Sequence, residues 1–122
     1  MAKILVIDDD EQVLGLIRIY LLQDGHAVVT ARNGKEGIKE LSARQFDLVI
    51  TDIIMPEQDG IGVLRWLKGQ TYRPKVLAIS GGAASFDLEY ILELSSYMQA
   101  DMVLPKPVAY NTLKEAVNEL LA

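Results

Sequence analysis

Short aliphatic runs alternate with amphipathic segments along the chain, and this alternation limits its fold more than any other feature. The run 3–7 is aliphatic almost throughout, as in a strand covered on both faces, and from residue 11 apolar side chains recur at helical spacing. We expect strands at 3–7, 27–30, 46–51, 75–79 and 102–104, and helices at about 11–24, 33–43, 61–69, 86–98 and 110–120. This order predicts an α/β fold with right-handed crossovers. The form expected is a flavodoxin-like (βα)5 doubly wound parallel sheet with strand order 2-1-3-4-5.

Size and composition indicate one domain over residues 1–122. Half of the 122 residues are hydrophobic, which is enough to bury a core. The formal charge of -5 and the lack of a basic run argue against direct nucleic-acid binding. With no cysteine there is no disulfide or thiolate metal site, and no apolar run reaches the roughly 20 residues of a membrane span. We expect a soluble, cytoplasmic protein with no membrane contact, in which the single histidine, His26, has no catalytic role.

Polar residues follow the ends of four predicted strands. Asp8 and Asp9 follow the first strand, Asp52 the third, Ser80 the fourth and Lys106 the fifth. Each alone has a structural explanation, since acids start helices, serine begins turns and lysine is commonly solvated. In the predicted strand order, however, all of them meet at one edge of the sheet. We therefore interpret the set as a functional site.

The composition of this set favours phosphoryl chemistry. Three clustered carboxylates repel by about 4 kcal/mol per close pair at an intermediate dielectric, so their pKa values rise or a cation lies among them. A site of oxygen ligands with room for water suits Mg²⁺. A carboxylate such as Asp52 can attack phosphorus, while the Lys106 ammonium and the Ser80 hydroxyl stabilise the phosphoryl oxygens.

These residues, in this order, resemble the receiver domain of bacterial two-component response regulators. The resemblance extends over essentially the whole chain. It is carried by the motifs Asp8-Asp9 after 4–7, Asp52 at the start of 52–60, Ser80-Gly81 and Lys106-Pro107. A lone acidic pair or Lys-Pro would be a weak signal, but the ordered set is specific.

The resemblance implies that Asp52 accepts a phosphoryl group from a sensor histidine kinase or a phosphotransfer protein. It implies that Asp8, Asp9 and Asp52 bind Mg²⁺ together with the backbone carbonyl of Ile54. The expected function is a phosphorylation-controlled signalling switch that changes affinity for an output domain or target protein. Such a protein is not an enzyme beyond self-directed phosphoryl transfer and slow self-dephosphorylation.

The resemblance also implies roles for Ser80 as the switch hydroxyl and for Lys106 as a phosphoryl contact, with a cis Lys106-Pro107 bond. The chain departs from the family pattern in two ways. Val103 stands where receivers usually carry Tyr or Phe, and the stretch from Ser80 to Lys106 is about one helical turn longer than usual. Both departures favour an altered readout or partner.

Two residues bear on the expected lifetime of the phosphoryl group. Ile54 and Gly82 lie two positions after Asp52 and Ser80, and the resemblance implies that they flank the path of an attacking water. The side chain of Ile54 is aliphatic and Gly82 has none, so neither residue can hydrogen-bond that water through a side chain. We therefore predict slow self-dephosphorylation.

Three other interpretations stay open. A receiver fold could act as an interaction module without phosphorylation, as Val103 would permit. A Mg²⁺-dependent phosphohydrolase with an Asp nucleophile is disfavoured because Ile53 and Ile54, with no second acid, follow Asp52. A flavin site is disfavoured because acids at 8–10 stand where a phosphate would need donors.

Overall fold

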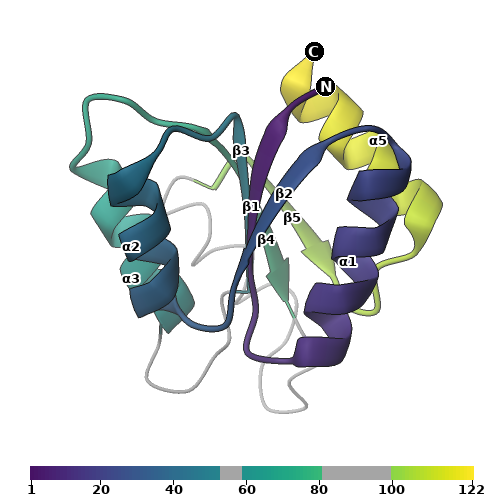
Figure 1. Ribbon diagram of the computed structural model, residues 1–122, viewed down its shortest axis with the longest axis horizontal. Coiled ribbons are helices and arrows are strands. Elements are labelled where there is room, and N and C mark those ends of the chain that lie inside the picture. The colour runs from purple at the N-terminus through teal and green to yellow at the C-terminus, as the bar shows by residue number, and fades with distance from the viewer. Residues whose placement is uncertain (53–58, 81–99) are drawn as a thin grey trace.

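Within residues 1–52, 59–80 and 100–122, the part of the chain that the computed structural model describes, five parallel strands form one sheet. Figure 1 shows the strands running side by side between the helices. In sheet order they are β2 (Ala27–Ala31), β1 (Lys3–Ile7), β3 (Leu48–Asp52), β4 (Lys75–Ser80) and β5 (Met102–Pro105). The predicted order 2-1-3-4-5 is confirmed. All carboxyl ends therefore lie along one edge of the sheet.

The described helices follow the predicted segments closely. They are α1 (Glu11–Gln23), α2 (Gly34–Ala43), α3 (Asp59–Lys68) and α5 (Tyr110–Leu121). The helix predicted at about 86–98 lies outside the described residues. Among the described helices none combines the length and the apolar character needed to cross a bilayer.

One strand boundary differs from the prediction by two residues. The expected strand 46–51 begins only at Leu48, because Phe46 enters the core from the preceding loop and not from the ladder. Its ring is 1% exposed, so its hydrophobicity is explained by burial without strand pairing. Asp47 ends this loop by accepting a hydrogen bond from the Lys3 N–H at 2.8 Å. The predicted strand was too long at its start because Phe46 is apolar like the strand residues that follow it.

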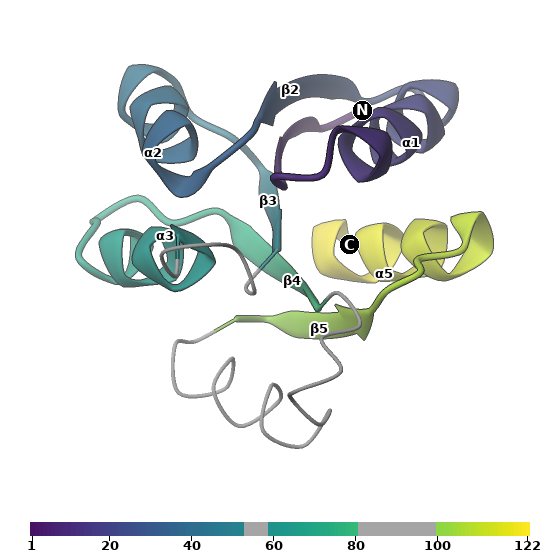
Figure 2. The ribbon, with the colours of Figure 1, turned by 90° about the horizontal axis from the view of Figure 1, so that it is seen from below.

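The helices cover both faces of the sheet. Seen from below in Figure 2, α1 and α5 lie on one side and α2 and α3 on the other. Alternate residues of the central strands enter two separate cores, since successive side chains of a strand point to opposite faces. Ile4 and Val6 pack on the α1 and α5 side, whereas Leu5 and Ile7 pack on the α2 and α3 side. Burial on both faces explains why these strands are continuous aliphatic runs.

Candidate functional site

Two acids from neighbouring strands meet at the carboxyl edge of the sheet. Ile7 pairs with Thr51 in the β1–β3 ladder, so the residues that follow them, Asp8 and Asp52, lie at the same level at the edge of the sheet. Asp8 is 0% exposed and Asp52 is 2% exposed. Asp9 is exposed beside them, and one carboxylate oxygen of each of the three acids lies within 4.8 Å of the others. The structure therefore brings together the three acids that the sequence singled out.

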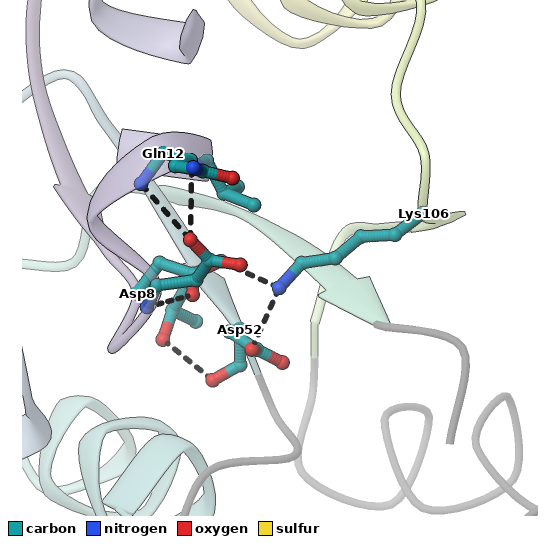
Figure 3. A network of polar contacts seen from close by, with 7 residues as sticks. Asp8, Gln12, Asp52 and Lys106 are labelled. Atoms are coloured by element: carbon teal, nitrogen blue, oxygen red, sulfur yellow. Dashed lines mark hydrogen bonds and ion pairs between the residues drawn. The ribbon is translucent and has the colours of Figure 1, made fainter. Parts of the chain in front are cut away.

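Lys106 reaches these acids from the end of β5. Its Nζ lies 2.9 Å from Asp52 Oδ2, to which it donates a hydrogen bond, and 2.7 Å from Asp8 Oδ2 (Figure 3). The lysine side chain is only 16% exposed. The peptide bond between Lys106 and Pro107 is cis, as the resemblance implied. The ammonium is thus held between two buried carboxylates.

Backbone donors fix the orientation of the first acid. Asp8 Oδ1 accepts a hydrogen bond from the Asp10 N–H at 2.9 Å. Asp10 in turn is the N-cap of α1, and its Oδ1 accepts from the Gln12 N–H at 2.9 Å. Asp10 therefore starts the helix, as is common for Asp at this position. In Figure 3 the labelled Gln12 lies above Asp8.

Burial and charge oppose each other in this cluster. Desolvation raises the pKa of Asp8 above its ordinary value, although the contact with Lys106 and the Asp10 N–H partly oppose this. Burial alone would lower the pKa of Lys106, but the hydrogen bonds and charges of Asp8 and Asp52 together outweigh it, and the pKa rises. The ammonium is therefore firmly charged at neutral pH.

The residues present fit a divalent cation. Asp8 Oδ2 is buried, and among the described residues the Lys106 ammonium lies 2.7 Å from it. Three carboxylates and one ammonium leave a net charge of -2, which one divalent ion would neutralise. Hard oxygen donors are the ligands that Mg²⁺ prefers. Asp8, Asp9 and Asp52 are the residues that would hold it.

The backbone places Ser80 at the same edge. Asp52 pairs with Ile79 in the β3–β4 ladder, and Ser80 is the next and last residue of β4. Ile54, Gly81 and Gly82 lie outside the described residues.

Two further residues complete the comparison with the sequence. Val103 pairs with Ala78 and packs half-buried against the core on the α2 and α3 side. His26 lies at the opposite edge of the sheet, where its Nδ1 accepts from the Ala2 N–H at 3.1 Å. The single histidine thus has a partner away from the acids, as expected.

A groove beside Lys106 was not predicted. It has a volume of about 390 Å³ and is lined by residues from the start of α1 and from the segment after β5, namely Asp10, Val13, Leu16, Ile17, Lys106, Pro107 and Val108. Three large apolar side chains of α1 are exposed: Leu16, Ile19 and Leu22, at 45%, 58% and 43%. Their regular spacing of three residues was available in the sequence as a second apolar stripe on the helix.

Comparisons with known proteins agree with the geometry of the site. The family model described as response regulator receiver domain matches residues 4–118. A transcriptional regulatory protein for alkaline phosphatase synthesis, PhoP of Bacillus subtilis, is 32% identical over 98% of this chain and 48% of its own length. The transcriptional regulatory protein CpxR of Escherichia coli is 31% identical over 99% of this chain and 50% of its own length. The chain thus spans about half the length of these relatives.

Solved structures of similar length share the whole fold. A response regulator receiver domain protein from Clostridium thermocellum has a TM-score of 0.86 and 35% identity over 99% of this chain and 94% of its own. The chemotaxis protein CheY4 of Vibrio cholerae has the same TM-score at 24% identity, which supports the fold alone. Receiver domains generally bind Mg²⁺ at an acidic pocket, and such an acidic cluster is present here. The chain belongs to the response regulator receiver domains, the phosphorylation-controlled switches of two-component systems.

Proposed function

We propose that Asp52 accepts a phosphoryl group from a phosphohistidine of a sensor kinase or phosphotransfer protein, in a reaction that requires Mg²⁺. The observation that carries the proposal is the position of Lys106, whose Nζ lies within 2.9 Å of oxygens from both Asp8 and Asp52. A nucleophilic carboxylate beside a fixed ammonium and two further carboxylates suits phosphoryl transfer, where positioning and charge neutralisation supply most of the catalysis.

In the proposed step an oxygen of the Asp52 carboxylate attacks phosphorus. A new O–P bond forms, the P–N bond to imidazole breaks, and the nitrogen keeps the electron pair of that bond. Lys106 donates from its ammonium to the phosphoryl group, and the hydroxyl of Ser80 donates to another of its oxygens. When bound by Asp8, Asp9, Asp52 and the carbonyl of Ile54, Mg²⁺ supplies further positive charge for the phosphoryl oxygens.

The product is a stable signal and not a turnover intermediate. Because Ile54 and Gly82 offer no side-chain hydrogen bond to an attacking water, we propose that the aspartyl phosphate hydrolyses slowly. The new charge at Asp52 would draw Lys106 and Ser80 toward it and shift a two-state equilibrium of the domain. The shifted state would then bind an output domain or a target protein with altered affinity.

The groove beside Lys106 is the surface that we propose for the phosphodonor. Lys106 belongs both to this groove and to the acidic site, so a helix seated there would bring its histidine to Asp52. The exposed Leu16 and Ile19 continue the apolar surface along α1. An amphipathic helix lying in an apolar groove is a common mode of recognition.

Residues 1–122 would act as one domain in the cytoplasm, where histidine kinases have access to ATP. The acidic charge of -5 suits a domain that contacts proteins and not a nucleic-acid backbone or a membrane surface.

Beryllofluoride, which mimics a phosphoryl group, tests the proposal in solution. With Mg²⁺ it should shift the amide NMR signals of Asp52, Ser80 and Lys106. Asp52→Asn should abolish these shifts, because an amide cannot take up the fluoride complex. Glu119→Gln, which removes an exposed acid from α5, should respond like the wild type. Equal shifts in wild type and Asp52→Asn would refute the assignment of Asp52.

A further inference from the structure

A tyrosine at the start of α5 is tied to the end of α1. The Tyr110 hydroxyl donates a hydrogen bond of 2.5 Å to Asp24 Oδ1, across 86 positions of sequence. The Tyr110 ring packs at 58° against the ring of Tyr20, with centroids 5.2 Å apart. Asp24 is itself the C-cap of α1, and its N–H bonds to the carbonyls of that helix's last turn. The tyrosine is therefore attached to a rigid point of the fold.

This contact anchors a helix start that has no side-chain cap. Ala109 is the N-cap of α5 and makes no side-chain hydrogen bond to the first turn. Helix starts without such a bond are less well fixed, typically by about 1 kcal/mol. The hydrogen bond from Tyr110, the first residue of α5, to Asp24 is thus the side-chain bond that holds this end of the helix among the described residues.

The same end of α5 is joined to the acidic site by a short segment. Only Pro107, Val108 and Ala109 separate Lys106 from Tyr110. The ring of Pro107 restricts its backbone, and Val108 packs against the core on the α1 and α5 side. The segment after Lys106 is thus held at its far end by Tyr110 and has little freedom between.

We propose that Tyr110 is a positioning residue for Lys106, acting through its hydrogen bond to Asp24. By fixing the end of segment 107–109, the bond holds the ammonium where it meets Asp8 and Asp52, and so speeds phosphoryl transfer. The inference rests on the proposed function of Asp52. The inference goes beyond the proposed function because neither Tyr110 nor Asp24 touches the reacting groups.

Tyr110→Phe isolates the hydrogen bond, because it keeps the ring against Tyr20 and removes only the donor. With acetyl phosphate and saturating Mg²⁺, the phosphorylation rate should fall about fivefold, the size expected for partial loss of one charge-assisted hydrogen bond. The dissociation constant for Mg²⁺ should stay within twofold of wild type, since the three acids are not moved. The side-chain ¹⁵N signal of Lys106 should shift or broaden.

Variants of the acceptor and of the neighbouring ring complete the test. Asp24→Ala should slow phosphorylation as Tyr110→Phe does, and combining the two changes should add nothing further, because both remove the same bond. Asp24→Asn keeps an accepting oxygen and should stay close to wild type. Tyr20→Phe removes the neighbouring hydroxyl and keeps the ring contact, so it should also be unchanged. If Tyr110→Phe does not fold, the two Asp24 variants make the same comparison.

The possible failures are distinguishable. A Tyr110→Phe protein that is phosphorylated at the wild-type rate overturns the positioning role and leaves the proposed function intact. Slowing by Tyr20→Phe to the same extent, or a parallel loss of Mg²⁺ affinity, also overturns it, since general packing would then be the cause. A wild-type protein that is never phosphorylated overturns the proposed function and this inference with it.

Discussion

Lys106 Nζ lies 2.7 Å from Asp8 Oδ2, so the ends of β5 and β1 are linked although β3 and β4 lie between these strands in the sheet. The same ammonium bonds to Asp52 at the end of β3. One cation therefore offsets the repulsion between two buried carboxylates, which would otherwise oppose folding. The Asp52 carboxylate, which we propose as the nucleophile, thus already contacts the ammonium that would stabilise the phosphoryl group.

Removing this ammonium should destabilise the metal-free protein. Lys106→Met leaves Asp8 and Asp52 buried without a cation, at an expected cost of about 3 kcal/mol at neutral pH. Urea unfolding followed by circular dichroism measures the change. Adding Mg²⁺ should restore more stability to the variant than to wild type. Equal unfolding midpoints without metal would contradict the electrostatic account, and Lys39→Met, at an exposed position of α2, provides the matched control.

The cap of α1 should be separable from metal binding. Asp10→Ala removes the oxygen that accepts from the Gln12 N–H and should lower the free energy of unfolding by about 1 kcal/mol. The Asp10 N–H that donates to Asp8 is a backbone group and remains. Mg²⁺ affinity should therefore change less than twofold, whereas Asp10→Ser should recover most of the stability. A loss of Mg²⁺ binding in Asp10→Ala would show that the carboxylate has a ligand role instead.

The two apolar stripes of α1 should respond differently to truncation. Ile17 is 1% exposed, so Ile17→Ala should cost about 3 kcal/mol of stability by opening a cavity. Ile19 is 58% exposed, so Ile19→Ala should change stability by less than about 0.5 kcal/mol.

Phosphorylation rates with two kinds of donor test whether the exposed apolar stripe of α1, which includes Ile19, docks the phosphodonor. Ile19→Ala should slow phosphorylation by a histidine-containing donor protein, while the rate with acetyl phosphate stays at the wild-type value. If Ile19→Ala is phosphorylated at the wild-type rate by both donors, α1 is not part of the proposed docking surface.

Two tyrosines should ionise late in an alkaline titration. The hydrogen bond to Asp24 raises the pKa of Tyr110, and burial raises the pKa of Tyr72. Because both folded-state pKa values lie above the ordinary tyrosine value of 10.0, their contributions to stability are complete below that pH and are lost as pH rises through the raised values. In a titration followed by tyrosinate absorbance, the part of the signal that appears at the highest pH should be smaller in Tyr110→Phe than in wild type. It should also be smaller in Tyr72→Phe. An unchanged titration curve would contradict these environments.

The fold could be predicted because local signals agreed with the global arrangement. The aliphatic run at 3–7 and the cap at Asp10 each mark one boundary, and the structure has β1 and α1 at these places. The edge of the sheet that collects Asp8, Asp52 and Lys106 then follows from the strand order alone. The spacing of apolar residues and the positions of turn residues indicate directly where strands and helices begin and end.

Contacts that depend on side-chain direction could not be predicted. The predicted helix at about 110–120 says nothing of the Tyr110 hydroxyl, which bonds to Asp24, far away in sequence. The second apolar stripe with Leu16 and Ile19 can be read from the sequence, but helical spacing alone does not say whether another element covers it. Helical spacing specifies neighbours on the same helix but not partners on another.

The most direct test of the account is the mass of the intact protein after incubation with acetyl phosphate and Mg²⁺. The account predicts a gain of one phosphoryl group in wild type, none in Asp52→Asn, and a much slower gain in Lys106→Ala. Chelation of the metal should prevent the gain in wild type. Phosphorylation of Asp52→Asn to the wild-type extent would contradict the central claim that Asp52 is the acceptor.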